Sequence, residues 1–188
     1  ARGYDIDHID QVWEILRAFA SFGFCKAHAA AFALPTYQSA WLKTHHPAAF
    51  YAGLLTHDPG MYPKRLILND ARNFGVTILR LDINASNSVY HLEQLPDLSF
   101  GIRVAFTDLK EISEAEIERI ISGQPFSSLS DLWLRARPSR PVTENLVVAG
   151  AFDALYGFTS RQVRGRITRR DLLLQIADLD RARGKTEK

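Results

Sequence analysis

Cysteine is nearly absent from this 188-residue sequence, in which Cys25 is the only one. A single cysteine excludes an internal disulfide and fits a reducing compartment such as the cytoplasm. No run approaches the roughly 18 apolar residues that a membrane-spanning helix needs, so we expect no membrane contact. Residues 1–7 lack the basic and then apolar layout of a secretory signal. The only methionine is Met61 and the first residue is Ala1, which favours a piece cut from a longer protein.

Three common enzyme motifs are missing as well. The sequence has no Gly-x-x-x-x-Gly-Lys loop for phosphates, no dinucleotide-binding glycine fingerprint and no serine nucleophile elbow. From general motifs alone, the sequence therefore predicts a helical binding module.

The charge is unevenly distributed, although the formal net charge is only +2. Residues 1–134 carry 11 basic and 15 acidic side chains, whereas residues 135–188 carry 12 basic and 6 acidic ones, and ten of those 12 are Arg. A basic end of this kind is either an electrostatic footprint for nucleic acid or a solvated helix surface.

The pattern of apolar residues and turn signals predicts a mainly α protein with a few short β-strands. Pro35 is expected to interrupt the helical pattern of the alanine-rich stretch, and a soft boundary is expected within residues 76–100. Helices are predicted at 7–22, 25–33, 36–43, 47–56, 63–74 and 160–183, and three more are predicted to begin after Ser113, Ser128 and Pro141. Strands are predicted at 76–79, 89–93 and 100–104. The last two strands are expected to pair around Pro96 and Asp97.

Two groups of residues resemble metal ligands. Asp5, Asp7 and Asp10 either hold metal ions or favour the positive end of the helix that they begin, and we expect the second role. Cys25 and His28 lie three residues apart, but a zinc site needs two further ligands, for which His45 and His46 have no standard spacing. A buried thiol at Cys25 is the expected alternative.

One segment is more specific than any of these patterns. The run Phe22-Gly23-Phe24-Cys25-Lys26-Ala27-His28-Ala29-Ala30-Ala31-Phe32-Ala33 closely resembles a signature of the bacterial C-family polymerases, the DNA polymerase III alpha subunits and their error-prone relatives. Further blocks follow in the family's order: residues 37–50, residues 70–76 with 82–84, and Ala149-Gly150-Ala151-Phe152-Asp153. The resemblance covers about residues 10–157, and the block around His45 and His46 tilts it towards the error-prone branch.

The resemblance implies that residues 1–90 are the C-terminal part of the polymerase fingers, that residues 91–157 hold short strands and a tandem helix-hairpin-helix module, and that residues 158–188 are a basic, then Leu-rich helix or tail. The family's catalytic aspartates and their Mg²⁺ lie in the palm, upstream of these blocks. We therefore expect no catalytic residue, metal or cofactor in this chain, and no polymerase activity from it alone. The expected partners are primer-template DNA and the remainder of the polymerase chain.

Within the fingers signature, Lys26 and His28 are implied to face the incoming nucleotide or the template, because an ammonium or imidazole group can neutralise or donate to phosphate. Tyr37 and Trp41 either stack on bases or pack in a core, and core packing is the stronger expectation.

The hairpins are implied to hold the DNA backbone. Such hairpins usually carry Gly-hydrophobic-Gly, but the first one reads Glu111-Ile112-Ser113, so only the Ser113 hydroxyl is left as a candidate contact. The second hairpin is richer in cations, and Arg135, Arg137 and Arg140 are its candidate phosphate contacts. The alternative for these arginines is pairing with nearby acids.

A different class of function stays open. The chain could be a stand-alone interaction module with a polymerase-derived fold and no role on DNA, using the Leu-rich residues 172–179 as a partner-binding helix. In either case, apolar surface that lacks its neighbours is expected to cause self-association.

Overall fold

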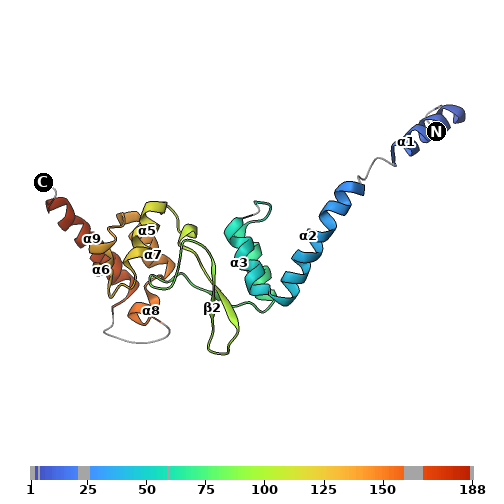
Figure 1. Ribbon diagram of the computed structural model, residues 1–188. Helices are drawn as coiled ribbons and strands as arrows, with labels where there is room; N and C mark the ends of the chain where they lie inside the picture. The colour runs from blue at the N-terminus through green and yellow to red at the C-terminus, as the bar shows by residue number, and fades with distance from the viewer. Residues whose placement is uncertain (1–2, 4, 21–25, 59, 159–166, 187–188) are drawn as a thin grey trace. The chain divides into compact units, whose positions relative to one another are not determined.

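The computed structural model describes residues 3, 5–20, 26–58, 60–158 and 167–186 (Figure 1). The chain divides into two compact units, residues 1–45 and residues 46–188. Helices dominate the described residues, and three short strands form one small sheet. The mainly α fold class with a few short strands is confirmed.

The first unit holds α1 (Ile6–Ala20) and α2 (Lys26–His45). Pro35 lies inside α2, so the predicted interruption there is wrong. The five alanines at positions 27–33 have the highest helix propensity, and they offset the one backbone hydrogen bond that proline removes. The predicted end of the first helix and the buried thiol at Cys25 lie outside the described residues.

The acidic start of α1 fits the dipole interpretation. Asp7 lies in the first turn of the helix, and the Asp5 carbonyl accepts a hydrogen bond from the Ile9 amide at 3.1 Å. Helix α1 is amphipathic, and its apolar residues are exposed: Ile6, Ile9, Val12, Trp13, Ile15 and Leu16.

The second unit begins with a helix pair packed on the sheet. Helix α3 (Pro47–His57) has proline at its first position, as predicted, and lies against α4 (Lys64–Asn73). Gly75, at φ 77°, ends α4. Tyr51, Leu55, Ile67, Ala71 and Ile102 form the centre of this apolar core.

The sheet is built from β1 (Ile78–Leu79), β2 (His91–Gln94) and β3 (Phe100–Arg103), in the order β1-β3-β2. Strand β3 pairs in parallel with β1 and antiparallel with β2. The predicted hairpin is confirmed: the Leu95 amide donates to the Ser99 carbonyl at 2.8 Å, and Asp97 accepts from the Ser99 amide in the turn.

A second, larger core is formed by short helices. They are the 3₁₀ turn η1 (Phe106–Asp108), α5 (Glu114–Gly123), α6 (Leu129–Arg135), α7 (Arg140–Ala149), α8 (Asp153–Tyr156) and α9 (Arg169–Thr186). The predicted caps are confirmed, because the Ser113 and Ser128 hydroxyls accept from backbone amides of α5 and α6. Helix α8 has no counterpart among the predicted helices, since a single turn is too short to show a period.

Helix α9 closes this second core, where it packs against α6 and α7 (Figure 1). Leu172 and Ile176 are fully buried, and Leu173 and Leu179 pack against the same cluster. The Leu-rich face is therefore occupied within this chain. Its use as a partner-binding helix, which is the alternative from the sequence, does not fit.

Gly150 ends α7 with φ 85°, a left-handed conformation that side chains disfavour. A Cβ at this position would lie 2.6 Å from Arg169 Nη2 and 2.9 Å from Asp153 Oδ2, in the middle of an ion pair. We expect Gly150→Ala to lower the free energy of unfolding by about 1–3 kcal/mol, measured by urea unfolding followed with far-UV circular dichroism.

The matched control is Gly53→Ala. Gly53 lies inside α3 with nothing within 4 Å of an added Cβ, so this substitution is expected to stabilise by about 0.5–1 kcal/mol. Equal effects of the two substitutions would contradict the role assigned to Gly150.

Candidate functional site

The second core contains two helix-hairpin-helix units that repeat the same order of turn and helix. The first joins η1 to α5 through residues 109–113, and the second joins α6 to α7 through residues 136–139. At equivalent positions, Glu111 has φ 66° and Arg137 has φ 48°, although neither is glycine. Ser113 and Ser139 then occupy the two helix N-caps in the same extended conformation. The turns thus keep the backbone of a glycine-containing hairpin without its glycines.

Each hairpin is held by a side chain of the other. Arg119 of α5 donates through Nε to the Ala136 carbonyl in the second turn, at 2.8 Å. At the equivalent position of α7, Asn145 donates through Nδ2 to the Lys110 carbonyl in the first turn, at 3.1 Å. Because these two bonds are reciprocal, the hairpins form one module with an approximate two-fold relation.

Glu116 joins the two turns directly. One carboxylate oxygen accepts from the Ser113 amide and hydroxyl at 3.1 and 2.8 Å, and the other accepts from the Ser139 amide at 2.8 Å. Its side chain is almost fully buried, and the residue is only 8% exposed. The capping box predicted from the sequence is the Ser113 half of this arrangement. The Ser139 half is a contact between two distant segments, for which the sequence has no local signal.

The electrostatics of Glu116 follow from these bonds. Burial alone would raise its pKa, but hydrogen bonds from the Ser139 amide and from the Ser113 hydroxyl and amide outweigh burial and lower the pKa below 4.5, its ordinary value. The carboxylate is therefore ionised at neutral pH and occupies amides that a hairpin of this type can offer to a phosphate.

Arg135, a predicted phosphate contact, is committed to the protein. It forms a bidentate pair with Asp131 and donates to the carbonyls of Gly123 and Pro125 at 2.6 and 2.7 Å. Its guanidinium also lies 4.5 Å from the centre of the Phe126 ring. The same pairing holds the pKa of the Asp131 carboxyl well below its usual range. Arg135 therefore fastens the α5–α6 connection.

Arg140 and Arg137, the other two predicted contacts, are differently placed. Arg140 pairs with Glu144 at 2.8 Å and with Asp180 of α9 at 3.4 Å, and all three side chains are partly exposed. Such exposed pairs are weak and exchange readily. Arg137 stands exposed at the tip of the turn, and no hydrogen bond or ion pair joins it to another described residue. The Ser113 hydroxyl, the fourth candidate, already donates to Glu116.

Helix α9 adds a further cation beside the second turn. The Arg183 guanidinium lies 3.9 Å from the centre of a Trp133 ring and donates to the Pro138 carbonyl at 3.3 Å. The second turn is thus surrounded by Arg137, Arg140 and Arg183. Neither the stacking on Trp133 nor the bond to Pro138 could be inferred from the basic composition of the C-terminal segment.

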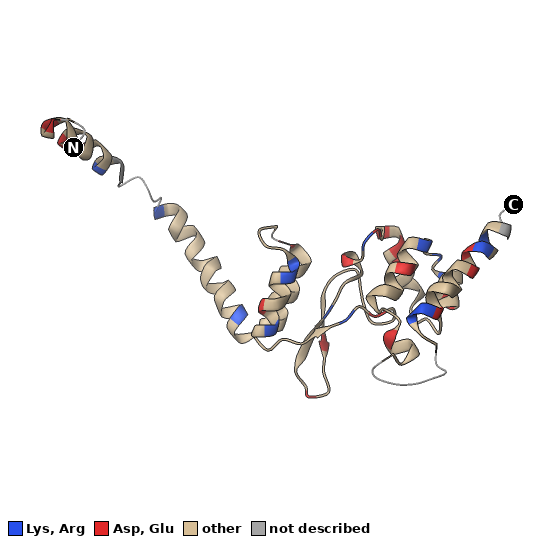
Figure 2. Ribbon diagram, turned by 180° about the vertical axis from the view of Figure 1, so that it is seen from behind, with Lys and Arg blue, Asp and Glu red and all other residues tan. Residues whose placement is uncertain are grey.

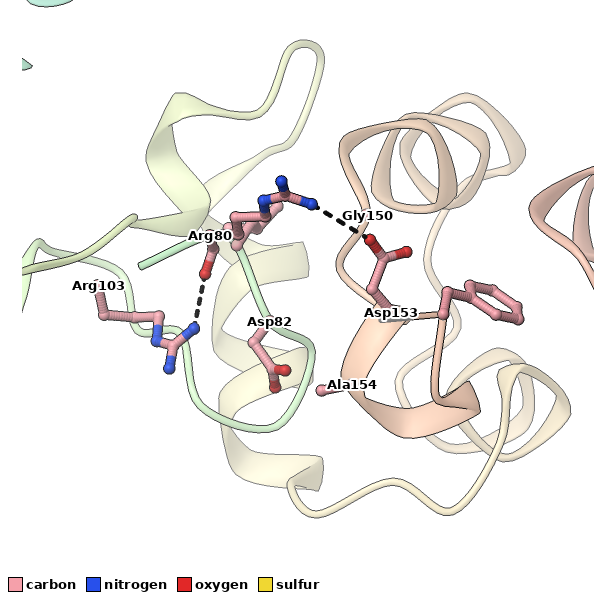
Figure 3. Close-up of a pocket in the computed structure, with 8 residues that line it drawn as sticks. Arg80, Asp82, Arg103, Gly150, Asp153 and Ala154 are labelled. Carbon is pink, nitrogen blue, oxygen red and sulfur yellow. Dashed lines mark hydrogen bonds and ion pairs between the residues drawn. The ribbon is translucent and has the colours of Figure 1, made fainter. Parts of the chain in front are cut away.

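A pocket of about 520 Å³ lies between the segment after β1 and the α7–α8 turn (Figure 3). Its charges are balanced and largely paired: Arg103 donates to the Arg80 carbonyl and to Glu93, and Asp153 pairs with Arg80 and Arg169. The Asp82 carboxylate accepts two backbone amides of its own turn. The pocket is therefore a junction between the sheet and the hairpin module rather than a site with spare charge.

Lys26 and His28 lie in the first turns of α2, in the other unit, and both are exposed. The His28 ring lies 4.5 Å from the ring of Phe32, one turn further along. Tyr37 and Trp41 are 67% and 44% exposed, so the expectation that they pack in a core is wrong for this chain. Figure 2 shows how few charged residues α2 carries; they are Lys26 and Lys43.

No group of three or more His, Cys, Asp or Glu side chains among the described residues could hold a metal ion. No helix in the described part of the chain is both long enough and apolar enough to cross a membrane.

Comparison with known proteins agrees with the hairpin geometry. Residues 75–163 match the family model of the helix-hairpin-helix motif. The chain is 42% identical over 166 residues to the error-prone DNA polymerase of Azoarcus sp. (strain BH72), and 37% identical over 157 residues to that of Brucella abortus. The alignments cover 84% and 82% of this chain but 16% and 15% of the two relatives, so the chain spans about a sixth of their length.

Glu116 yields a stability prediction with a defined pH dependence. Because its pKa is lowered on folding, its contribution is fully present above pH 4.5 and is lost as the pH falls through the lowered folded value. We expect Glu116→Gln to lower the free energy of unfolding at pH 7 by about 2–3 kcal/mol, and the difference from the wild type to shrink as the pH falls below 4.5.

Urea unfolding of both proteins at pH 7 and at several acidic values tests this. Asp97, Asp131 and Asp171 also have lowered pKa values, but they are present in both proteins and cancel in the difference. A difference that stays constant across the acidic range would show that the charge of Glu116 is not what stabilises the module.

Proposed function

We propose that this chain, which is similar to error-prone DNA polymerases over 82–84% of its length, is a non-catalytic, DNA-holding part of such a polymerase of the bacterial C-family. In this role it supports replication or error-prone repair synthesis by holding the primer-template, while the chemical step and its Mg²⁺ belong to the palm. The observation that carries the proposal is the second hairpin, whose tip presents Arg137 with no acidic partner among the described residues.

The contact proposed is with the phosphate backbone and not with base edges. A guanidinium pairs with phosphate oxygens whatever the sequence, and such contacts fix position along the strand. Arg140 joins Arg137 by exchanging its exposed partners Glu144 and Asp180 for a phosphate. Arg135 is assigned to the fold, because its hydrogen-bond donors already have acceptors within the protein.

The α2 residues belong to a second proposed contact. Lys26 and His28 lie in the first turns of a helix, where backbone amides and the helix dipole favour negative groups. We assign them to the triphosphate of the incoming nucleotide or to the template strand, in the setting of the complete polymerase. The exposed rings of Tyr37 and Trp41 on the same helix are available for stacking on bases.

The hairpin contact is tested by titrating a fluorescent primer-template at several salt concentrations. The slope of log K against log salt measures phosphate contacts, at about −0.9 per contact on duplex DNA. Arg137→Ala is expected to weaken binding and to reduce the slope by about 0.9, without a change in unfolding free energy.

Arg135→Ala is the matched control, because it removes the same positive charge as Arg137→Ala. It is expected to lower the unfolding free energy while leaving the salt slope close to that of the wild type. A reduced slope for Arg135→Ala with no change for Arg137→Ala would reverse the assignment, and no binding at low salt would refute the proposed function.

The exposed apolar residues of α1 imply a covering partner, which we propose is the rest of the polymerase or, in its absence, a second copy of this chain. Self-association is therefore expected at high concentration, and Trp13→Glu combined with Leu16→Glu should reduce it. Static light scattering measures both, and a monomeric wild type would contradict the expectation.

A further inference from the structure

The two hairpins have the same backbone but opposite charges at their tips. At equivalent positions of the repeat, Glu111 stands where the second hairpin has Arg137, and Glu114 stands where it has Arg140. All four residues are exposed. Two exposed positions that carry carboxylates in the first hairpin thus carry guanidinium groups in the second, although the first turn also has one exposed cation, Lys110, where the second has Ala136.

The backbone amides do not compensate for the inversion. The Ser113 amide at the start of α5 and the Ser139 amide at the start of α7 are both bound by the Glu116 carboxylate. One amide of each hairpin is therefore already bonded, which gives the side chains of the tip more weight in contacting a ligand. For the first hairpin these are two carboxylates, which repel a phosphate and outnumber the single cation Lys110, and for the second they are guanidinium groups, which attract it.

We infer that the module is a one-strand clamp, in which the second hairpin holds the backbone of a single strand and Glu111 and Glu114 keep the opposite backbone away from the first hairpin. The inference rests on the DNA contact proposed above and adds its strand preference. A two-fold pair of hairpins with equal charges would suit the two antiparallel backbones of a duplex, one hairpin to each. With one tip inverted, a duplex offers no more phosphate contacts than a single strand does.

The test transplants the charges of the second hairpin onto the first. In Glu111→Arg combined with Glu114→Arg, the first tip acquires the residues found at 137 and 140, and Arg137 shows that an Arg adopts positive φ in this turn. Binding to a fluorescent duplex and to a single strand of equal length is titrated against salt with the complete 188-residue chain.

For the wild type we expect equal numbers of phosphate contacts on the two DNAs, after allowing about −0.9 per contact on a duplex and about −0.7 on a single strand. The double variant is expected to gain about two contacts on the duplex, steepening its slope by roughly 1.8, and none on the single strand. Glu111→Gly, which suits the positive φ and removes one charge, should shift the preference in the same direction and guards against misfolding of the double variant.

Glu118→Arg is the matched control, since it makes the same change of charge as Glu111→Arg at an exposed position one turn into α5. If Glu118→Arg favours the duplex as strongly, per charge changed, as the double variant does, general electrostatics explains the gain and the inference fails. The inference also fails, with the proposed function intact, if the wild type makes about twice as many contacts on the duplex as on the single strand. If the wild type binds neither DNA, both are refuted.

Discussion

The carboxylate of Glu116 is the point on which the hairpin module depends. It lies buried between two turns that are far apart in the sequence and satisfies a backbone amide in each. A buried ionised group is costly unless it is fully hydrogen-bonded, and here three donors from two serines supply that compensation. Arg119 and Asn145 add one hydrogen bond each across the same interface.

The arginines of the C-terminal half divide into two groups once the module is assembled. Three arginines donate to backbone carbonyls and so stabilise the fold. Arg135 fastens the α5–α6 connection, Arg169 the α7–α8 turn and Arg183 helix α9. Arg137 stands apart from this network at the tip of a turn. The basic excess of residues 135–188 is thus mostly structural, and the part available to an anion is small and localised. That restriction makes the charge of individual tip residues decisive.

Much of the fold could be predicted from local signals. The caps at Ser113 and Ser128, the proline that begins α3, the glycine that ends α7 and the hairpin around Asp97 each depend on a few neighbouring residues. The prediction at Pro35 is wrong because helix propensity summed over a long alanine-rich segment outweighs one breaker. The two helix-hairpin-helix units follow from the resemblance and not from a local pattern, since neither turn keeps the glycines that mark such a motif.

The site was harder to predict, because its residues act through distant partners. Asp131, four residues before Arg135 on α6, is a local signal for the ion pair of Arg135, but the bonds of Arg135 to the carbonyls of Gly123 and Pro125 depend on another segment. The bridge from Glu116 to Ser139 is equally invisible in the sequence. Charge composition could indicate an anion-binding segment, but only the hydrogen-bond partners decide which cations remain for a ligand.

Neither hairpin turn has a glycine, and Glu116 bonds to both turns. Glycine serves such a turn by letting its amides approach a phosphate closely, but here the carboxylate of Glu116 already binds the amides of Ser113 and Ser139. Once these amides are bonded, glycine has less advantage in the turn. A side chain at positive φ costs about 1 kcal/mol, which the reciprocal hydrogen bonds across the module offset. A side chain at the tip can in turn carry charge of either sign. The same backbone thus carries an acidic side chain at residue 111 and a basic one at residue 137, both at positive φ.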